Sequence, residues 1–194
     1  MLISMHTFKK LFRRANAKQS IGGAALIISI AYLLSRLLGL LRDRLLISHF
    51  GVGSTLDAYM AAFSIPDLLF TLLVSGAFAV TFIPVFTKEL KKSDQHEAWE
   101  MAASLLNLLV LITIIAAVIG SIFADQLVYI TAGGFKGQEH ELTVSLTRIM
   151  LLTPIFFAIS SVFGSIQQAK GRFLIYSLAS VLYNIGIILS LIHI

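Results

Sequence analysis

The sequence predicts an all-α integral membrane protein, and three observations support this fold class. Hydrophobic residues make up 57% of the 194-residue chain and charged residues only 13%, and the mean hydropathy is +0.89. Apolar runs recur at the length of about 20 residues that a helix needs to cross a bilayer. No segment shows the alternating pattern of a β-strand. We therefore expect about five transmembrane helices and no soluble domain.

The charge distribution and the absence of cysteine exclude several classes of protein. The formal net charge is +5, but the basic residues lie in short segments between apolar runs, which argues against a nucleic-acid partner. Without cysteine the chain has no disulfide, no thiolate metal site and no thiol catalysis. The sequence indicates no cofactor and no metal site.

Residues 1–20 are basic and amphipathic, and we interpret them as a cytoplasmic lead-in to the first span. The apolar run that follows is too long for a signal peptide, and no cleavage site follows it. It is therefore predicted to be an uncleaved transmembrane helix over 21–41.

One side of this first helix is small or polar. Arg36 lies about two-thirds of the way across a hydrocarbon core roughly 30 Å thick, where a charge costs roughly 2.5–3.5 kcal/mol. Two interpretations remain open: Arg36 serves a polar, ligand-binding cavity, or it forms a structural ion pair with Asp43 or Asp57. At about 100° per residue, one arc of about 100° contains Gly22, Ala25, Ser29, Tyr32, Arg36, Gly39 and Asp43.

The second predicted span, 57–86, repeats this pattern. Pro66 lies within the run, where proline removes a backbone hydrogen bond and kinks a helix. Two consecutive helices with one polar side each favour a shared central cavity. The polar side of this span holds Asp57, Ser64, Asp67, Thr71 and Ser75.

Three further spans are predicted at 101–124, 145–168 and 173–188. Pro154 should bend the fourth span. Asn184 lies in an apolar run of the fifth and needs a hydrogen-bond partner, in a structural bond to another helix or in a functional role. The last six residues, 189–194, match the in-frame translation of a common transposon sequencing adapter, so we expect Ile188 to be near the last natural residue of a chain that is itself a fragment.

The stretch from 35 to 87 carries a family resemblance. It contains the runs SRLLGLLRD, HFGVGSTLDAYMAAFSIPDLLF and GAFAVTFIPVF. These resemble the start of the MurJ/MviN family of lipid II flippases, in the superfamily of multidrug, oligosaccharidyl-lipid and polysaccharide exporters. The resemblance covers about residues 20–188. It implies that 21–188 form part of the N-terminal lobe of a two-lobed, fourteen-helix protein that works by alternating access coupled to the membrane potential.

The resemblance also implies a function and roles for residues. The protein would flip lipid II from the inner to the outer leaflet of the bacterial cytoplasmic membrane for cell-wall synthesis, with the lipid-linked precursor and membrane lipids as partners, and would be monomeric at full length. Arg36, Arg42 and Asp57 would serve the substrate-binding cavity. Arginine suits a diphosphate because its planar fork donates paired hydrogen bonds. We expect the cavity lining to include Ser35, Asp43, Ser64, Asp67, Thr71 and Ser75, and hinges at Gly39, Pro66 and Pro154.

One departure from the family pattern bears on binding. Phe70 and Thr71 stand where many members carry basic residues, and Ser75 stands at a family glutamate position. The second span therefore contributes less positive charge to the cavity.

Three functions are alternatives to a lipid II flippase. A membrane-embedded enzyme needs a nucleophile–base pair or a cluster of metal ligands, and the sequence shows neither. A structural scaffold would not explain why a charged residue, Arg36, is placed within the membrane despite the free-energy cost. Another exporter of the same superfamily would move drugs or other lipid-linked sugars.

The distribution of Lys and Arg predicts the orientation in the membrane. The N-terminal segment, the 87–100 connection and the 169–172 connection are the basic ones. The N-terminus is therefore predicted to be cytoplasmic, with 42–56 and 125–144 outside. The residues that set this asymmetry are Lys9, Lys10, Arg13, Arg14, Lys18, Lys88, Lys91, Lys92, Lys170 and Arg172.

Overall fold

The computed structural model describes residues 21–75, 78–92 and 95–193, and every regular element among them is a helix. Five helical stretches are long and apolar enough to cross a membrane, which confirms the predicted all-α membrane fold. The lead-in over 1–20 lies outside the described residues. The chain divides into two compact units, described separately below. The five stretches are Gly22–Phe50, Ser54–Val74, His96–Ile122, Gln138–Ala169 and Phe173–His193.

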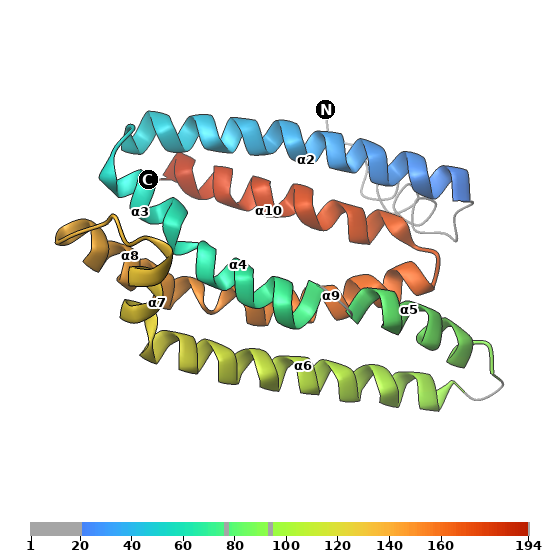
Figure 1. The fold of residues 1–194 in the computed structure, drawn as a ribbon. Coiled ribbons are helices and arrows are strands. Elements are labelled where there is room, and N and C mark those ends of the chain that lie inside the picture. Colours follow the sequence, from blue (N-terminus) through green and yellow to red (C-terminus); the bar gives the residue numbers. More distant parts are fainter. Residues whose placement is uncertain (1–20, 76–77, 93–94, 194) are drawn as a thin grey trace. The chain divides into compact units, whose positions relative to one another are not determined.

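The first unit combines a segment from the N-terminal part of the chain with one from the C-terminal part. Helix α2 (Ile21–Phe50) lies beside α10 (Phe173–His193), and the last turns of α9 (Thr153–Ala169) complete the unit (Figure 1). With 30 residues, α2 is about 45 Å long and extends beyond a bilayer core of roughly 30 Å. Helix α10 continues through residues 189–193. Its buried residues recur at spacings of three and four, as expected of a helix with one packed side: Ser177, Val181, Asn184, Ile188 and Leu191.

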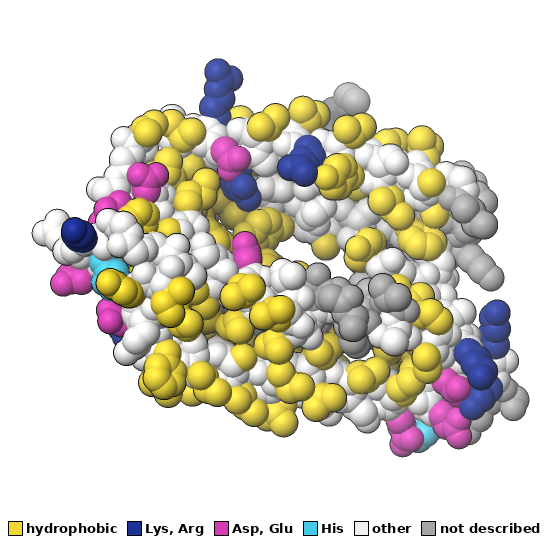
Figure 2. Space-filling view, viewed as in Figure 1, with side chains coloured by type: hydrophobic (Ala, Val, Ile, Leu, Met, Phe, Trp, Pro, Cys, Tyr) yellow, Lys and Arg dark blue, Asp and Glu magenta, His cyan; other side chains and the backbone are white. Residues whose placement is uncertain are grey.

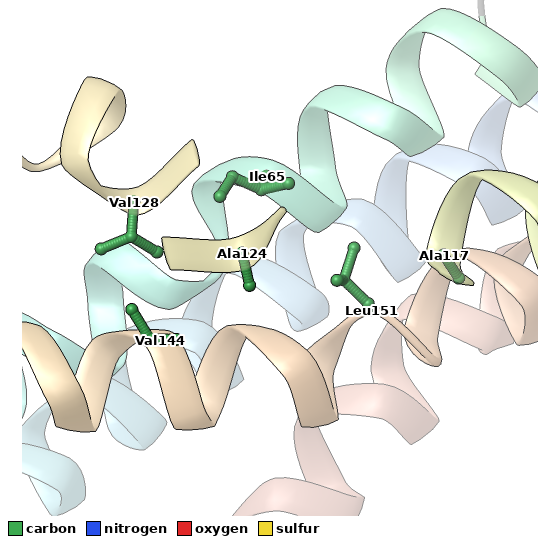
Figure 3. Close-up of a cluster of buried hydrophobic side chains, with 6 residues drawn as sticks. All are labelled: Ile65, Ala117, Ala124, Val128, Val144 and Leu151. Carbon is green, nitrogen blue, oxygen red and sulfur yellow. The ribbon is translucent and has the colours of Figure 1, made fainter. Parts of the chain in front are cut away.

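The second unit contains the remaining helices and has a small apolar core (Figure 3). Its elements are α3 (Ser54–Ala62), α4 (Ser64–Phe70), the π-helical turn η1 (Thr71–Ser75), α5 (Phe78–Glu89), α6 (His96–Ile122), α7 (Ala124–Thr131), α8 (Gln138–Met150) and the first part of α9. Helices α4, α6, α7 and α8 contribute to the core, whose side chains are Ile65, Ala117, Ala124, Val128, Val144 and Leu151.

The second span is interrupted near Pro66, where the sequence predicts a kink within 57–86. It begins at Ser54, and α3 ends at Ala62 before α4 begins at Ser64. Pro66 has no N–H to donate to the carbonyl of Ala62, four residues earlier, so the break lies just before this proline. Residues 71–75 are then π-helical, and α5 begins only at Phe78.

The fourth span is also divided, at the proline that the sequence singles out. Helix α8 ends at Met150 and α9 begins at Thr153. Pro154 cannot donate to the carbonyl of Met150, but the Thr153 hydroxyl does so, with an Oγ1–O distance of 2.7 Å. The threonine thus supplies the hydrogen bond that the proline removes.

The surface of the second unit is suited to lipid. Figure 2 shows hydrophobic side chains along α6, with charged and histidine side chains beside its start and over α7 and α8. Leu111, Val118 and Ile122 are each more than half exposed on this helix. Just before its start, Lys92 donates hydrogen bonds to the carboxylates of Glu89 and Glu97, which raises the pKa of Lys92. Its side chain is about half exposed, as expected of a segment in water. The chain is a multi-pass membrane protein.

Candidate functional site

Helix α2 brings most of the residues predicted for the first span into one cavity within the first unit. Its volume is about 460 Å³. The residues share one side of α2 because they lie three, four or seven positions apart. Three residues of α10 complete its lining. Its lining consists of Tyr32, Ser35, Arg36, Gly39, Leu40, Arg42, Asp43, Ser180, Tyr183 and Asn184.

Arg36 binds a neutral partner in this structure. Its Nε and Nη2 atoms donate to the hydroxyl oxygen of Tyr32 at 3.2 and 3.0 Å. The guanidinium carbon lies 5.4 Å from the centre of the same ring, within the range of a cation–π contact. The sequence places Tyr32 on the polar side of α2 but does not identify it as the partner of Arg36.

Arg42 binds Asp43, the one carboxylate among the described residues that line the cavity. Its Nε and Nη2 atoms donate to Oδ1 of Asp43 at 3.0 and 2.8 Å. Asp43, one of the two carboxylates considered as partners for Arg36, is thus paired with Arg42. The lining holds two arginines and one aspartate, so its net charge is positive.

Asn184, a lining residue of the cavity, joins α10 to α2. Its Nδ2 atom donates to the carbonyl and hydroxyl oxygens of Ser35 at 3.3 and 3.1 Å, and to the carbonyl oxygen of Ser180 at 3.0 Å. The helix-to-helix hydrogen bond considered for Asn184 is therefore present. Its Oδ1 atom is buried without a hydrogen-bond partner, and a Cβ at Gly39 would lie 3.8 Å from it.

The other predicted site residues belong to the second unit. Asp57 lies in the first turn of α3, where the helix dipole favours a carboxylate. Ser64 and Asp67 lie in α4 and Thr71 begins η1, and all of these side chains are exposed. Ser75 ends η1, but its side chain lies outside the described part of the structure.

The three predicted hinges have different local structures. Pro66 and Pro154 lie two and one residues after the starts of α4 and α9, just beyond a break in each case. Gly39 lies within an unbroken helix, beside the Asn184 amide, and an added Cβ would be in ordinary van der Waals contact with that amide. Whether any of these positions moves is still a prediction.

The contribution of α10 to the cavity is the feature that the sequence analysis missed. The predicted cavity lay between the first and second spans, whereas the fifth span supplies Ser180, Tyr183 and Asn184. A signal was available, because Ser177, Ser180 and Asn184 recur at helical spacing in an otherwise apolar run.

The cavity is equipped to bind an anion. Two guanidinium groups face it, and its other side chains are hydroxyl, amide or apolar groups apart from Asp43. Among the described residues, no group of three potential ligand side chains could hold a metal ion. The chemistry that these side chains support is therefore electrostatic and hydrogen-bonded recognition.

Comparison with known proteins identifies the family. The family model described as "Lipid II flippase MurJ" matches residues 46–193, which is most of the chain. The chain belongs to the MurJ family. It is 34% identical over 163 residues to the probable lipid II flippase MurJ of Buchnera aphidicola subsp. Schizaphis graminum, an alignment that covers 83% of this chain and 32% of that protein. It is 32% identical over 168 residues to the lipid II flippase MurJ of Burkholderia cenocepacia, covering 85% and 32%.

A solved structure supports the same MurJ fold. The chain resembles a lipid II flippase MurJ in an inward closed conformation with a TM-score of 0.66 and 28% identity, over 85% of this chain and 36% of that one. The chain thus spans about a third of the length of the MurJ proteins that it matches.

Proposed function

We propose that this chain forms part of the N-terminal lobe of a flippase that moves the lipid-linked peptidoglycan precursor lipid II across the bacterial cytoplasmic membrane. The observation that carries the proposal is the cationic cavity between α2 and α10, in a chain of the MurJ family. A diphosphate needs paired donors that stay charged, and Arg36 and Arg42 are such donors. The relatives are named as flippases, so we class the protein as a transporter and not as an enzyme.

In the proposed mechanism, the cavity binds the polar head while the polyprenyl tail stays in lipid. The guanidinium groups replace the water that the diphosphate loses, which lowers the cost of moving its charge through the membrane. Alternating access then exposes the cavity to each side of the membrane in turn. Asp57 and the polar residues of the second span are proposed to serve the same path, with the N-terminus in the cytoplasm.

A chimaera tests this proposal. Residues 20–188 replace the matching third of the Burkholderia cenocepacia relative, and the chimaera is expressed in bacteria depleted of their own flippase. We expect growth to be restored. Arg36→Ala should abolish rescue at normal membrane abundance, because a charged hydrogen bond contributes roughly 1.5–3 kcal/mol. Arg36→Lys should rescue only partly, because an ammonium group cannot present the paired fork.

Arg44→Ala is the matched control, because Arg44 lies on the same helix, is exposed and does not line the cavity. It should support normal growth. Full rescue by Arg36→Ala would contradict the role of this arginine. A chimaera that accumulates in the membrane yet never restores growth, while the unaltered relative does, would contradict the proposed function.

A further inference from the structure

The phenol of Tyr32 occupies one specific edge of the Arg36 guanidinium. A guanidinium donates from two edges that can each hold a paired acceptor: the Nε and Nη2 edge, and the Nη1 and Nη2 edge. Tyr32 accepts hydrogen bonds from Nε at 3.2 Å and from Nη2 at 3.0 Å, so it occupies the first edge. The second edge stays available for a two-point hydrogen bond to a phosphate group. Tyr32 and Arg36 are one helical turn apart, and both line the cavity.

The neutral partner has an electrostatic consequence. Asp43 cancels much of the charge of Arg42 at 2.8 Å, whereas a phenol satisfies two donors of Arg36 without cancelling its charge. Arg36 is therefore held in place and keeps its full positive charge for an anion. Because the Tyr32 oxygen accepts both hydrogen bonds, its own O–H is left to donate to the same ligand.

We propose that Tyr32 is a positioning residue for Arg36. It fixes the guanidinium so that the Nη1 and Nη2 edge faces the cavity, and this orientation sets the affinity for a lipid diphosphate. The assignment rests on the proposed function, since the ligand is the diphosphate of the lipid-linked substrate. It differs from a packing role, because a packing role needs only the ring of Tyr32 and not its hydroxyl.

The test uses Tyr32→Phe, which keeps the ring and removes the hydroxyl. The chimaera described above, which carries residues 20–188 within the full-length relative, is placed in phosphatidylcholine nanodiscs, and two quantities are measured. Hydrogen exchange at Nε of Arg36, assigned by NMR with the help of Arg36→Lys, reports whether the guanidinium is held. The affinity for undecaprenyl diphosphate reports how strongly the cavity binds a lipid diphosphate. Tyr176→Phe is the matched control, because Tyr176 lies on α10 in the same unit and does not line the cavity.

We expect slow Nε exchange in the wild type and in Tyr176→Phe, and at least tenfold faster exchange in Tyr32→Phe. Affinity should fall roughly 3- to 10-fold in Tyr32→Phe, the size of one neutral hydrogen bond, and by more in Arg36→Ala. Affinity should not change in Tyr176→Phe.

The possible failures are distinguishable. Two results would overturn the role of Tyr32 and leave the proposed function standing. One is fast Nε exchange in the wild type. The other is an affinity that is unchanged in Tyr32→Phe although Arg36→Ala weakens binding. Equal, negligible binding by the wild type and Arg36→Ala contradicts the proposed function, and the assignment of Tyr32 falls with it.

Discussion

At the residue scale, the two arginines of the cavity differ in what balances them. Arg42 is half-buried and bonded to Asp43, while Arg36 is exposed and bonded to Tyr32. Beside its proposed role in binding, Arg42 has a structural role, since removing one member of a charge pair leaves the other without its partner. Arg36 has no carboxylate partner among the described residues, so its substitution should affect binding without leaving a charge unpaired. The two positions should therefore respond differently to substitution.

We predict that Asp43→Ala lowers stability and that Arg42→Ala/Asp43→Ala recovers part of the loss. Asp43→Ala leaves Arg42 without its carboxylate, and the second substitution removes the stranded charge. The unfolding free energy in mixed detergent micelles should show a coupling of roughly 0.5–3 kcal/mol between the two positions. Arg36→Ala/Asp43→Ala is the comparison pair, and its effects should be additive. Equal coupling in both pairs would contradict the assignment of Asp43 to Arg42.

Helical periodicity predicted part of the cavity and could not predict the rest. Arg36, Gly39 and Asp43 were placed on one side of a helix because their angles follow from spacing alone. The bond between Asn184 and Ser35 joins residues 149 positions apart, so it depends on which helices pack together. The bond from Arg36 to Tyr32 depends on side-chain rotamers, which spacing does not determine.

At the element scale, prolines determine where two spans break. At one break, a threonine hydroxyl donates the hydrogen bond that the proline cannot donate. Pro66 and Pro154 identified the interrupted spans from sequence, because proline lacks the N–H that a helix needs. The π-helical turn over 71–75 was not predicted, since no residue type in it requires that geometry. The hydroxyl of Thr153 satisfies the Met150 carbonyl that Pro154 leaves unbonded.

We predict that Thr153→Val destabilises the second unit by about 1 kcal/mol, the contribution of one hydrogen bond to a carbonyl that would otherwise be unsatisfied. Thr153→Val/Pro154→Ala should recover the loss, because an alanine in place of the proline regains the N–H that reaches the Met150 carbonyl. Thr131→Val is the control, since the Thr131 hydroxyl also donates to a carbonyl of the preceding helical turn but is exposed to solvent. Unfolding in mixed micelles measures all three variants. If Thr131→Val lowers the unfolding free energy as much as Thr153→Val does, the Thr153 hydroxyl has no special role in replacing the hydrogen bond that Pro154 lacks.

At the scale of the whole molecule, five candidate spans and an uneven distribution of Lys and Arg predict one orientation. Spans that each cross the membrane once alternate in direction, so the connections at 87–95 and 169–172 are predicted to lie on the same side. Both are basic, whereas the connection after α6 combines Lys136 with Asp125, Glu139 and Glu141. Lys and Arg are retained on the cytoplasmic side of bacterial membranes, and acidic residues contribute little.

We predict that Gln95 is cytoplasmic and Gly134 external. Green fluorescent protein fused after Gln95 should fluoresce, and alkaline phosphatase fused there should be inactive, whereas fusions after Gly134 should show the reverse. The physical reason is the cost of moving Lys88, Lys91 and Lys92 across the membrane against its potential, roughly 2.3 kcal/mol per charge per 100 mV. Replacing these three lysines with glutamine should reduce the fraction of correctly oriented chains, whereas replacing Glu139 and Glu141 with glutamine should change it little. Active phosphatase after Gln95 would mean that the spans run in the opposite direction, which would place the N-terminus outside.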